Sequence, residues 1–594
     1  MTRGALLSLF PAIAMAQGTI STSQFTAEVD GFLKKEIAAH IVDIATLPQA
    51  RVVGALTTGD FSWGTFLRAA AACSQLSGEV NIAGRELPNF LGQAGLIEAR
   101  GGGKTFAQMF AALGLRRFGT NLKTNAMWQS LTPAEQAEWR SLLDPARFYD
   151  RAVRHVIDLP ENYFGVASRI ASMDLQMGII TDRTYVDDLL DQAAGQFVGG
   201  AIYSDDAIPT GRFDRYSQEY ARYVYEAAED AGRKDILAAL EPSLKTQLRL
   251  WWDMVAPDGY GYTWGRSVGL IGYMDTLEIV GFVAQHPQFR PAPLPQLASA
   301  YYAAWKSLMS EYLQNRHLLN VFGFGHGHFG YINPQREWQQ TTSFFGKAAN
   351  AEILFTEAMR KENVANFPAK LVPAPVERFE YFRKGARPAG VWVVRQSKLS
   401  FALPITTGTK PGVADYLAAP HGFPGFSVPV ERVVPALAPF LELADGRVIV
   451  AGDGADEIYP SADGKSLRAI WRRWVTIGGK PAAFVDPGIS TEVTWTLRGG
   501  ALVREESITG TVQIRKLRVL FPSTSDRVAT RFENEKRIDR FTSVEVESTI
   551  PSASLTATGD GELGRGNQGP IPLLLEWELR DVKLPFRWIV TLRP

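Results

Sequence analysis

The sequence predicts a multidomain α plus β protein, in which an N-terminal (α/α)6 helical toroid precedes a C-terminal antiparallel β-sandwich. Apolar residues recur at helical spacing over residues 24–365, whereas short β-rich runs separated by turns fill residues 389–594. Between them, residues 366–388 are rich in proline and poor in apolar periodicity, which predicts a linker. The 594 residues exceed the length of one ordinary domain, and a hydrophobic content of 46% excludes a disordered chain.

Residues 1–16 have the pattern of a signal peptide. Arg3 supplies a basic start, residues 5–15 form an apolar stretch, and Ala14-Met15-Ala16 is a small-x-small cleavage site. The stretch is shorter than the roughly 20 residues that span a bilayer, and no later run is apolar enough to do so. We therefore expect a secreted or periplasmic protein without a membrane span. A buried N-terminal helix is the alternative.

Proline and glycine residues divide the helical region into separate runs. Thr132, Pro133 and Glu135 form the clearest helix start, with an N-cap, a proline in the first turn and a capping-box acid. The predicted helices cover residues 132–143, 163–178, 184–196, 214–231, 233–253, 267–284, 295–314 and 343–360. At about 28 residues for each helix and loop, the region has room for around twelve helices, the number that a toroid of six hairpins requires.

The region after residue 388 is rich in β-branched and aromatic residues. Its predicted strands cover residues 391–395, 398–403, 447–451, 469–475, 492–497, 501–508, 516–521 and 588–592. Turns such as Ala444-Asp-Gly and Ala462-Asp-Gly separate these runs. Many short strands at this spacing indicate an antiparallel sandwich of about 200 residues.

The charge balance and the absence of certain motifs exclude several classes of function. Lys plus Arg and Asp plus Glu each number 62, so no overall basic field is present to collect nucleic acid. The sequence contains no Gly-x-Ser-x-Gly nucleophile elbow, no Walker loop and no His-Glu-x-x-His zinc motif. We expect no cofactor, no resident metal ion and no nucleic-acid partner.

Polar and aromatic residues gather in five segments, each located where one helical run ends or another begins. In a helical toroid these ends converge on one face, and loops on a rigid scaffold commonly carry function. The segments are 161–164, 203–206, 211–216, 258–267 and 325–331. Together they predict the rim of a substrate pocket.

Segment 258–267 carries the most specific signal of the five. Its three glycines allow the backbone to approach a ligand closely, and Tyr260, Tyr262 and Trp264 offer ring faces for a sugar. Arg266, at the entrance of the next helix, could bind a carboxylate through two hydrogen bonds. The alternative is a glycine-rich turn whose aromatic side chains cover the helical core and whose arginine pairs with a structural aspartate.

His326 and His328 allow two functional interpretations besides that of ordinary loop residues. In an extended segment both imidazoles point to one side, which permits a metal site with an Asp or Glu, but the sequence shows no third ligand nearby. As hydrogen-bonding or acid–base groups in the cleft they need no further ligand, because imidazole titrates near neutrality.

Four motifs within residues 160–290 resemble those of a poorly characterised family of bacterial and fungal proteins. They read Leu-Pro-Glu-Asn-Tyr-Phe, Tyr-Ser-Asp-Asp, Phe-Asp-Arg-Tyr-Ser-Gln-Glu-Tyr and Trp-Gly-Arg-Ser, and Asp415-Tyr-Leu-Ala-Ala-Pro-His-Gly is a weaker match. The expected fold of that family is similar to the (α/α)6 toroid of polysaccharide lyases and unsaturated-glycuronyl hydrolases. Asp206 and Arg215 depart from the glycine and the tyrosine of the family motifs. Because the family has no settled activity, the resemblance implies the fold more than the reaction.

The first functional hypothesis is a polysaccharide lyase that cleaves a uronic-acid-containing glycan by β-elimination. The reaction develops a second negative charge on the substrate carboxylate, for which Asn162 and Arg266 offer suitable donors. Toroid lyases use a tyrosine and a histidine as base and acid, so the resemblance implies Tyr216 or Tyr262 together with one of the two histidines. Several such lyases have an Asn-His pair where this chain has Asn162 followed by Tyr163, which leaves the roles of these residues open.

Two other hypotheses remain open. A glycoside hydrolase on the same scaffold needs a carboxylic acid and a carboxylate across the scissile bond, and the rim aspartates, including Asp206, could provide them. One of these, Asp214, could equally cap the helix that follows it. A non-catalytic glycan-binding protein would use the same aromatic cleft. In each case the expected partner is a polysaccharide or oligosaccharide, and the residues predicted to contact it are Tyr163, Tyr203, Asp205, Asp214, Asp258, Tyr260, Trp264 and Trp338.

Overall fold

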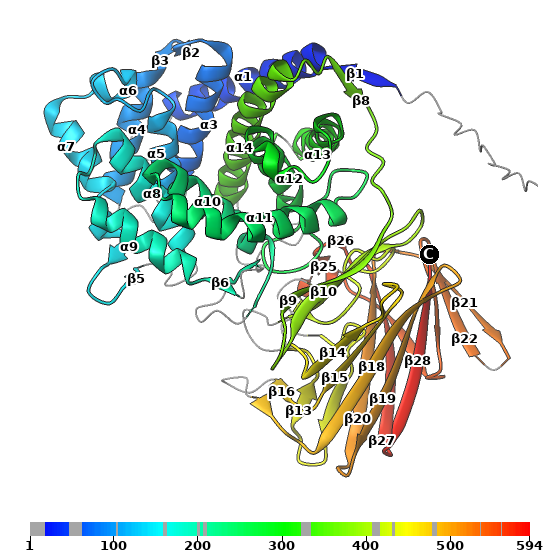
Figure 1. Ribbon diagram of the computed structural model, residues 1–594. Helices are drawn as coiled ribbons and strands as arrows, with labels where there is room; N and C mark the ends of the chain where they lie inside the picture. Colours follow the sequence, from blue (N-terminus) through cyan, green and yellow to red (C-terminus); the bar gives the residue numbers. More distant parts are fainter. Residues whose placement is uncertain are drawn as a thin grey trace, which may run out of the picture.

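Helices make up the N-terminal part of the protein and strands the C-terminal part (Figure 1). The computed structural model describes residues 18–46, 62–101, 105–157, 163–198, 202–205, 211–315, 317–321, 334–406, 416–429, 434–477, 484–534, 536–559 and 561–594. The signal peptide predicted for residues 1–16 lies outside these ranges, as do the predicted site residues Asn162, His326 and His328.

The helices agree closely with those predicted from apolar periodicity. They are α1 (Thr22–Thr46), α3 (Ser62–Ser77), α4 (Leu87–Gly101), α5 (Thr105–Arg116), α6 (Ala126–Gln129), α7 (Pro133–Leu142), α8 (Phe164–Met177), α9 (Arg183–Ala194), α10 (Arg215–Ala231), α11 (Lys234–Met254), α12 (Ile271–Gln285), α13 (Leu294–Gln314) and α14 (Pro334–Lys361). Helices α7 to α14 confirm the eight predicted helices. The largest difference at a helix start is in α14, which begins at Pro334 and not near residue 343.

Local sequence signals explain where several helices begin and end. The predicted capping box is present, because Glu135 N donates to Thr132 Oγ1 at 3.3 Å and Thr132 N donates to Glu135 Oε2 at 2.7 Å. Gly178 and Gly232 follow α8 and α10 with φ of 75° and 67°. Glycine adopts this left-handed conformation without the steric cost that a side chain brings, so it ends both helices.

Six helices pack against one another in a closed order, and we call them the ring helices. Helix α3 contacts α5, which contacts α8, and the order continues through α10, α12 and α14 back to α3. Helices α1, α4, α9, α11 and α13 pack against members of this ring (Figure 1). A large buried apolar cluster joins the helices of this part. A closed order is what the predicted toroid requires, and the complete (α/α)6 arrangement stays a prediction.

The C-terminal part contains three antiparallel sheets of three or more strands among the described residues. The smallest has the order β11 (Ser400–Ile405), β10 (Ala389–Arg395), β9 (Val376–Arg383). A seven-stranded sheet has the order β17 (Phe484–Val485), β16 (Trp474–Ile477), β13 (Val448–Val450), β12 (Phe440–Leu443), β20 (Ile514–Ser523), β27 (Leu573–Val582), β24 (Ala553–Ala557). An eight-stranded sheet has the order β14 (Glu457–Pro460), β15 (Ser466–Trp471), β18 (Ile489–Arg498), β19 (Ala501–Gly510), β28 (Phe586–Arg593), β23 (Glu545–Ser548), β22 (Lys536–Phe541), β21 (Val528–Glu533).

The two large sheets share one buried apolar core. Trp495 of β18 and Trp577 of β27 belong to the same cluster, although they come from different sheets. In β18 buried and partly exposed residues alternate over most of its length, as expected for a strand with one face on a core. The antiparallel sheets are therefore present as predicted, and their assignment as a β-sandwich domain stays a prediction.

One predicted strand is wrong, because residues 469–475 form parts of two strands. β15 ends at Trp471 in the eight-stranded sheet, and β16 begins at Trp474 in the seven-stranded sheet. The Asp456 carboxylate accepts hydrogen bonds from Arg472 N at 2.6 Å and from Arg473 Nε at 2.9 Å. These bonds hold the chain where it passes from one sheet to the other.

The predicted linker, residues 366–388, contains strands. β8 (Asn366–Pro368) pairs with β1 (Thr19–Ser21) beside the helices, and β9 belongs to the small sheet. Proline excludes helix but permits edge strands, so the proline-rich composition did not exclude these elements. The boundaries of the domains stay a prediction.

Short hairpins complete the described elements. They are β2 (Asn81–Ile82) with β3 (Arg85–Glu86), β4 (Tyr149–Asp150) with β5 (His155–Val156), β6 (Phe197–Val198) with β7 (Ile202–Tyr203), and β25 (Arg565–Gly566) with β26 (Gly569–Pro570). Within the described ranges, none of the helices has the length and apolar character needed to cross a bilayer.

Candidate functional site

The loop between α11 and α12 brings several predicted site residues into one buried cluster. Arg266 donates to Asp205 Oδ2 from Nε at 2.9 Å and from Nη2 at 2.6 Å. The same oxygen accepts a hydrogen bond from Arg212 Nη2 at 3.1 Å. Asp214 lies beside them, with its Oδ2 at 3.8 Å from Arg266 Nε. Two guanidinium groups thus surround two carboxylates that have no exposed surface.

A tyrosine from the β-rich part completes this cluster. Tyr416 Oη donates to Asp214 Oδ2 at 2.6 Å and accepts a hydrogen bond from Arg266 N at 3.2 Å. The helical part therefore holds the side chain of Arg266 through Asp205, and the β-rich part holds its backbone through Tyr416. Burial raises the pKa of Asp205 to about 6, and the negative charge of Asp214 also raises it, whereas Arg266 lowers it.

Tyr216 lies between two arginines at the edge of the cluster. The guanidinium carbons of Arg215 and Arg266 are each 4.3 Å from the centre of its ring. Tyr216 is partly exposed, and its hydroxyl has no hydrogen-bond partner among the residues that the structure describes. Nη1 of Arg266 likewise has no partner in the described part of the chain, and 22% of that side chain is exposed. Both residues are thus partly exposed, and each has a polar group that makes no hydrogen bond within the described residues.

Further tyrosines pack against the inner side of Tyr216. The ring of Tyr220 lies 5.5 Å from that of Tyr216, and it is 5.9 Å from the rings of Tyr163 and Tyr203. Tyr203 and Tyr220 are fully buried, and Tyr163 is 8% exposed. These rings support Tyr216 from inside. The predicted contacts of Tyr163 and Tyr203 with substrate stay a prediction.

The ring helices carry a buried ionic network next to Arg215. Its members are Arg68 of α3, Arg215, Glu219 and Arg222 of α10, Asp275 and Glu278 of α12, and Lys347 of α14. Arg215 Nε donates to Asp275 Oδ2 at 2.6 Å, and Lys347 Nζ donates to Glu278 Oε2 at 2.7 Å. Four cations face three carboxylates, so the network has a formal charge of +1. Its ion pairs with Asp275 and Glu219 fix the position of Arg215.

Other predicted residues of the loop are buried. Trp264 is fully buried and donates from Nε1 to Phe213 O at 3.1 Å. Tyr262 is also fully buried, and its hydroxyl has no partner among the described residues. Burial raises the pKa of Tyr262 well above its ordinary range. The burial of these two side chains agrees with the alternative interpretation of segment 258–267, in which its aromatic residues cover the helical core.

Asp214 caps α10, which agrees with the interpretation of this residue as a helix cap. Tyr216 N donates to Asp214 Oδ1 at 2.9 Å, and Asp214 N donates to Ser217 Oγ at 3.2 Å. The carboxylate is fully buried. The predicted contacts of Asp205 and Asp214 with substrate stay a prediction, whereas their structural contacts are plain.

Trp338 is not part of this cluster. It lies on the first part of α14, where its partly buried ring stacks on Phe66 of α3 at 5.8 Å. The ring of His40 is 6.1 Å away. Its predicted contact with substrate stays a prediction.

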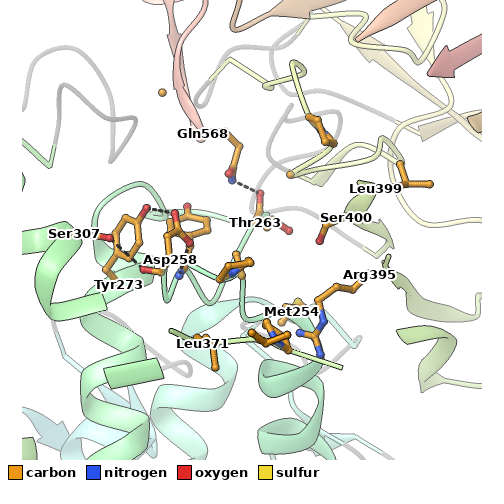
Figure 2. A pocket seen from close by; sticks show the side chains of 18 of the residues that line it. Met254, Asp258, Thr263, Tyr273, Ser307, Leu371, Arg395, Leu399, Ser400 and Gln568 are labelled. Carbon is orange, nitrogen blue, oxygen red and sulfur yellow. Dashed lines mark hydrogen bonds between the residues drawn. The ribbon is translucent and has the colours of Figure 1, made fainter. Parts of the chain in front are cut away.

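A separate cavity of about 1160 Å³ lies between the helices and the strands (Figure 2). Asp258 and Tyr260 line it, together with Tyr273 of α12. Tyr260 N donates to Asp258 Oδ1 at 3.1 Å, and Tyr273 Oη donates to Asp258 Oδ2 at 2.7 Å. Residues on both sides of Arg266 in the loop between α11 and α12, such as Tyr260 and Gly269, thus line this cavity, whereas Arg266 itself belongs to the neighbouring cluster. The single rim predicted from sequence is divided between two places.

A search of the described residues finds no group of three or more His, Cys, Asp or Glu side chains arranged to hold a metal ion. His326 and His328 were outside that search, so the expectation of no metal and no cofactor stays a prediction. The same holds for Asp206 and for Asn162, which the structure does not describe.

Sequence reasoning missed the ionic network and Tyr416. Two acids, Asp275 and Glu278, stand three residues apart in the otherwise apolar helix α12, and such buried acids need partners. In α10, Arg215, Glu219 and Arg222 are spaced to lie on one helix face. These patterns could have indicated the network. No sequence signal indicated that Tyr416 reaches Asp214 across the two parts of the protein.

Comparison with known proteins gives structural likeness only. No protein-family model and no curated protein matches the sequence. Among solved structures, heparinase III matches with a TM-score of 0.49 and 9% identity, over 90% of this chain and 77% of that chain. A chondroitinase AC lyase matches with a TM-score of 0.45 and 8% identity, over 95% of this chain and 83% of that chain. Both TM-scores are below 0.5, so neither likeness establishes a shared fold or activity.

Proposed function

We propose that the protein is a secreted polysaccharide lyase that cleaves a uronic-acid-containing glycan by β-elimination, built on a helical toroid followed by a β-sandwich. The observation that carries this proposal is the pairing of Tyr216 with Arg266. The Tyr216 hydroxyl and Nη1 of Arg266 have no partner among the described residues, and the guanidinium lies 4.3 Å from the tyrosine ring. One site thus offers a proton-transfer group beside a cation.

These two groups have the chemistry that β-elimination requires. A base removes the proton next to the uronate carboxylate, the electron pair forms a carbon–carbon double bond, and the glycosidic oxygen leaves with a proton from an acid. Arg266 would donate from Nη1 to the carboxylate while its second negative charge develops. Tyr216 would transfer a proton. Asn162 and one of His326 and His328 complete the proposed site as further carboxylate donor and acid–base partner.

Burial favours Tyr216 over Tyr262 as the acid–base residue. Tyr262 has no exposed surface, and burial raises its pKa well above the ordinary range, so loss of its proton is costly. Tyr216 is partly exposed and lies between the cations Arg215 and Arg266.

The same geometry gives less support to a glycoside hydrolase. Hydrolysis needs two carboxyl groups that reach the glycosidic bond from opposite sides. Asp205 and Asp214 have no exposed surface, and their oxygens are occupied by Arg212, Arg266, Tyr416 and the backbone of α10. A lyase needs no carboxylate from the protein, so these bonds do not obstruct it.

A dual assay tests the proposal. The secreted protein, beginning at Gln17, is incubated with polygalacturonate, alginate, hyaluronan and heparan sulfate, and with dextran as a neutral control. Elimination raises reducing ends and ultraviolet absorbance together, because the product double bond is conjugated to a carboxylate. Reducing ends without absorbance on any polymer would replace the lyase with a hydrolase. Binding to an acidic polymer without either signal would favour a non-catalytic protein.

A further inference from the structure

The cavity between the helices and the strands contains a buried arginine with unused donors. Arg395, the last residue of β10, lines the cavity and is only 5% exposed (Figure 2). Nε donates to Ala374 O at 2.8 Å, and Nη1 donates to Trp252 O at 3.0 Å and to Val255 O at 2.9 Å. Both N–H groups of Nη2 lack a partner in the part of the chain that the structure describes.

The structural contacts of Arg395 do not use its charge fully. Trp252 and Val255 lie at the C-terminal end of α11, where free carbonyl groups commonly attract a cation. All three acceptors of Arg395 are neutral backbone carbonyls, and no carboxylate bonds to it among the described residues. A buried guanidinium without a bonded counter-ion, beside a large cavity, is a ready donor to an anionic group.

The cavity has a positive balance in a protein whose formal charge is zero. Its charged lining residues are the cations Lys306, Lys370, Arg395 and Lys398 and the acids Asp258 and Glu311. Lys370 and Lys398 are exposed at the lining and have no ion pair among the described residues. The Asp258 carboxylate is already bonded to Tyr273. The excess of cations favours an anionic ligand.

The remaining lining suits a sugar chain more than a small ion. The cavity exceeds the roughly 300–1,000 Å³ of most small-ligand pockets, so it can hold several sugar rings. Tyr260 and Tyr273 pack at 5.0 Å, and Tyr273 is partly exposed beside the cavity. Ser307, Ser310 and Gln568 add polar groups that can bond sugar hydroxyls.

We infer that this cavity is a second glycan-binding site, which holds an acidic oligosaccharide through Arg395, Lys370 and Lys398. The class of ligand rests on the proposed function, because it is that of the proposed substrate. Neither Arg266 nor Tyr216 lines the cavity, so the site would bind a portion of the chain away from the cleaved bond. The enzyme would then bind a long polymer at two sites, the cavity and the cluster around Arg266.

Calorimetric titration tests the site in the full protein. The probes are a hyaluronan tetrasaccharide and a chondroitin sulfate tetrasaccharide, with cellotetraose as the neutral probe, all in the Tyr216→Phe background to prevent cleavage. The double variant Lys370→Ala/Lys398→Ala is expected to weaken binding of an acidic probe about tenfold, from two exposed charge contacts. The control Lys123→Ala/Lys583→Ala removes the same charge from exposed lysines outside the cavity and is expected to change binding less than twofold.

A third variant tests the arginine. Arg395→Lys keeps the charge and loses the planar fork, so it is expected to weaken acidic probes about tenfold further. The melting temperature of Arg395→Lys could fall because the bonds to three backbone carbonyls are lost. In that case the Lys370→Ala/Lys398→Ala variant still tests the inference. Equal affinity for cellotetraose, no binding of either acidic probe, or equal effects of the two lysine pairs would overturn the inference. Binding that depends on Lys370 and Lys398 in a protein without lyase activity would overturn the proposed function alone.

Discussion

Arg266 donates to a single oxygen of Asp205 from two of its nitrogens, Nε at 2.9 Å and Nη2 at 2.6 Å. Because both bonds end on one side of the guanidinium, Nη1 is left without a partner among the described residues. Asp205 is fully buried, whereas 22% of the Arg266 side chain is exposed. The pair therefore connects a structural anion in the interior with an open cation at the proposed active site.

The same pair predicts a measurable coupling in stability. Arg266→Ala is expected to lower the free energy of unfolding by about 3–5 kcal/mol, because it leaves a buried carboxylate with one guanidinium instead of two. Asp205→Asn in the Arg266→Ala background is expected to recover part of this loss. Urea unfolding of the two single variants and the double variant measures the coupling. If the loss of unfolding free energy in the double variant equalled the sum of the losses in the two single variants, the result would contradict an ion pair between Arg266 and Asp205.

The hydrogen bonds of Tyr416 predict that the β-rich part of the protein stabilises the site. Tyr416→Phe removes the hydroxyl that donates to Asp214 and accepts from Arg266 N, and it is expected to cost about 1–2 kcal/mol of unfolding free energy. The matched control is Tyr459→Phe, because Tyr459 is 44% exposed and its hydroxyl bonds only to the nearby Glu457 among the described residues, so its loss should cost less than that of Tyr416. Thermal melts of both variants measure the difference. Equal melting temperatures would show that the Tyr416 hydroxyl is not bonded as described.

The sequence predicted the helices well, because their signals are local. Apolar spacing and caps such as Thr132 depend on residues within one or two turns, and the structure reproduces them. The strands at residues 469–475 were read less accurately, because a long β-rich run does not show that the chain changes sheets at Arg472 and Arg473. That change depends on Asp456, which is distant in sequence.

The site was predicted less completely, because its contacts join distant segments. Segments 203–206, 211–216 and 258–267 were expected to meet. The hydrogen bonds of Asp205 to Arg266, and the Asp214 carboxylate 3.8 Å from Arg266 Nε, show that residues of all three do. Periodicity could not show that Tyr262 and Trp264 point into the core while Asp258 and Tyr260 line a cavity. Those positions depend on residues of the β-rich part, such as Asn567, whose Nδ2 donates to Thr263 O at 3.0 Å.

Lys347 predicts the importance of the buried network. Its amine contacts Glu219, Asp275 and Glu278, so Lys347→Met leaves three buried carboxylates with fewer cations and is expected to cost about 3–5 kcal/mol. Lys245→Met is the control, because that lysine is exposed and, among the described residues, pairs with Glu241 alone, and it should cost less than about 1 kcal/mol. Chemical unfolding of the two variants compares them. Similar stabilities would contradict a buried network.

Glu98 predicts a dependence of stability on pH. Burial raises its pKa from 4.5 to about 8, and Oε2 has no partner among the described residues. The unfolded chain loses this proton first, so the contribution of Glu98 to stability is present below pH 4.5 and is lost as the pH rises towards 8. Glu98→Gln removes the titration. The melting temperature of this variant, relative to wild type, is expected to rise between pH 4.5 and 8, and a constant difference would contradict the raised pKa.

The mass of the products tests the central claim most directly. An acidic oligosaccharide of defined length is incubated with the wild-type protein and with Tyr216→Phe, and both cleavage products are weighed by mass spectrometry. Elimination predicts two products whose masses sum to that of the substrate, and a rate that falls at least about 100-fold in Tyr216→Phe, the scale of lost acid–base catalysis. Products whose masses sum to the substrate plus one water would contradict the proposed lyase, and a Tyr216→Phe variant with full activity would contradict the role of Tyr216 in it.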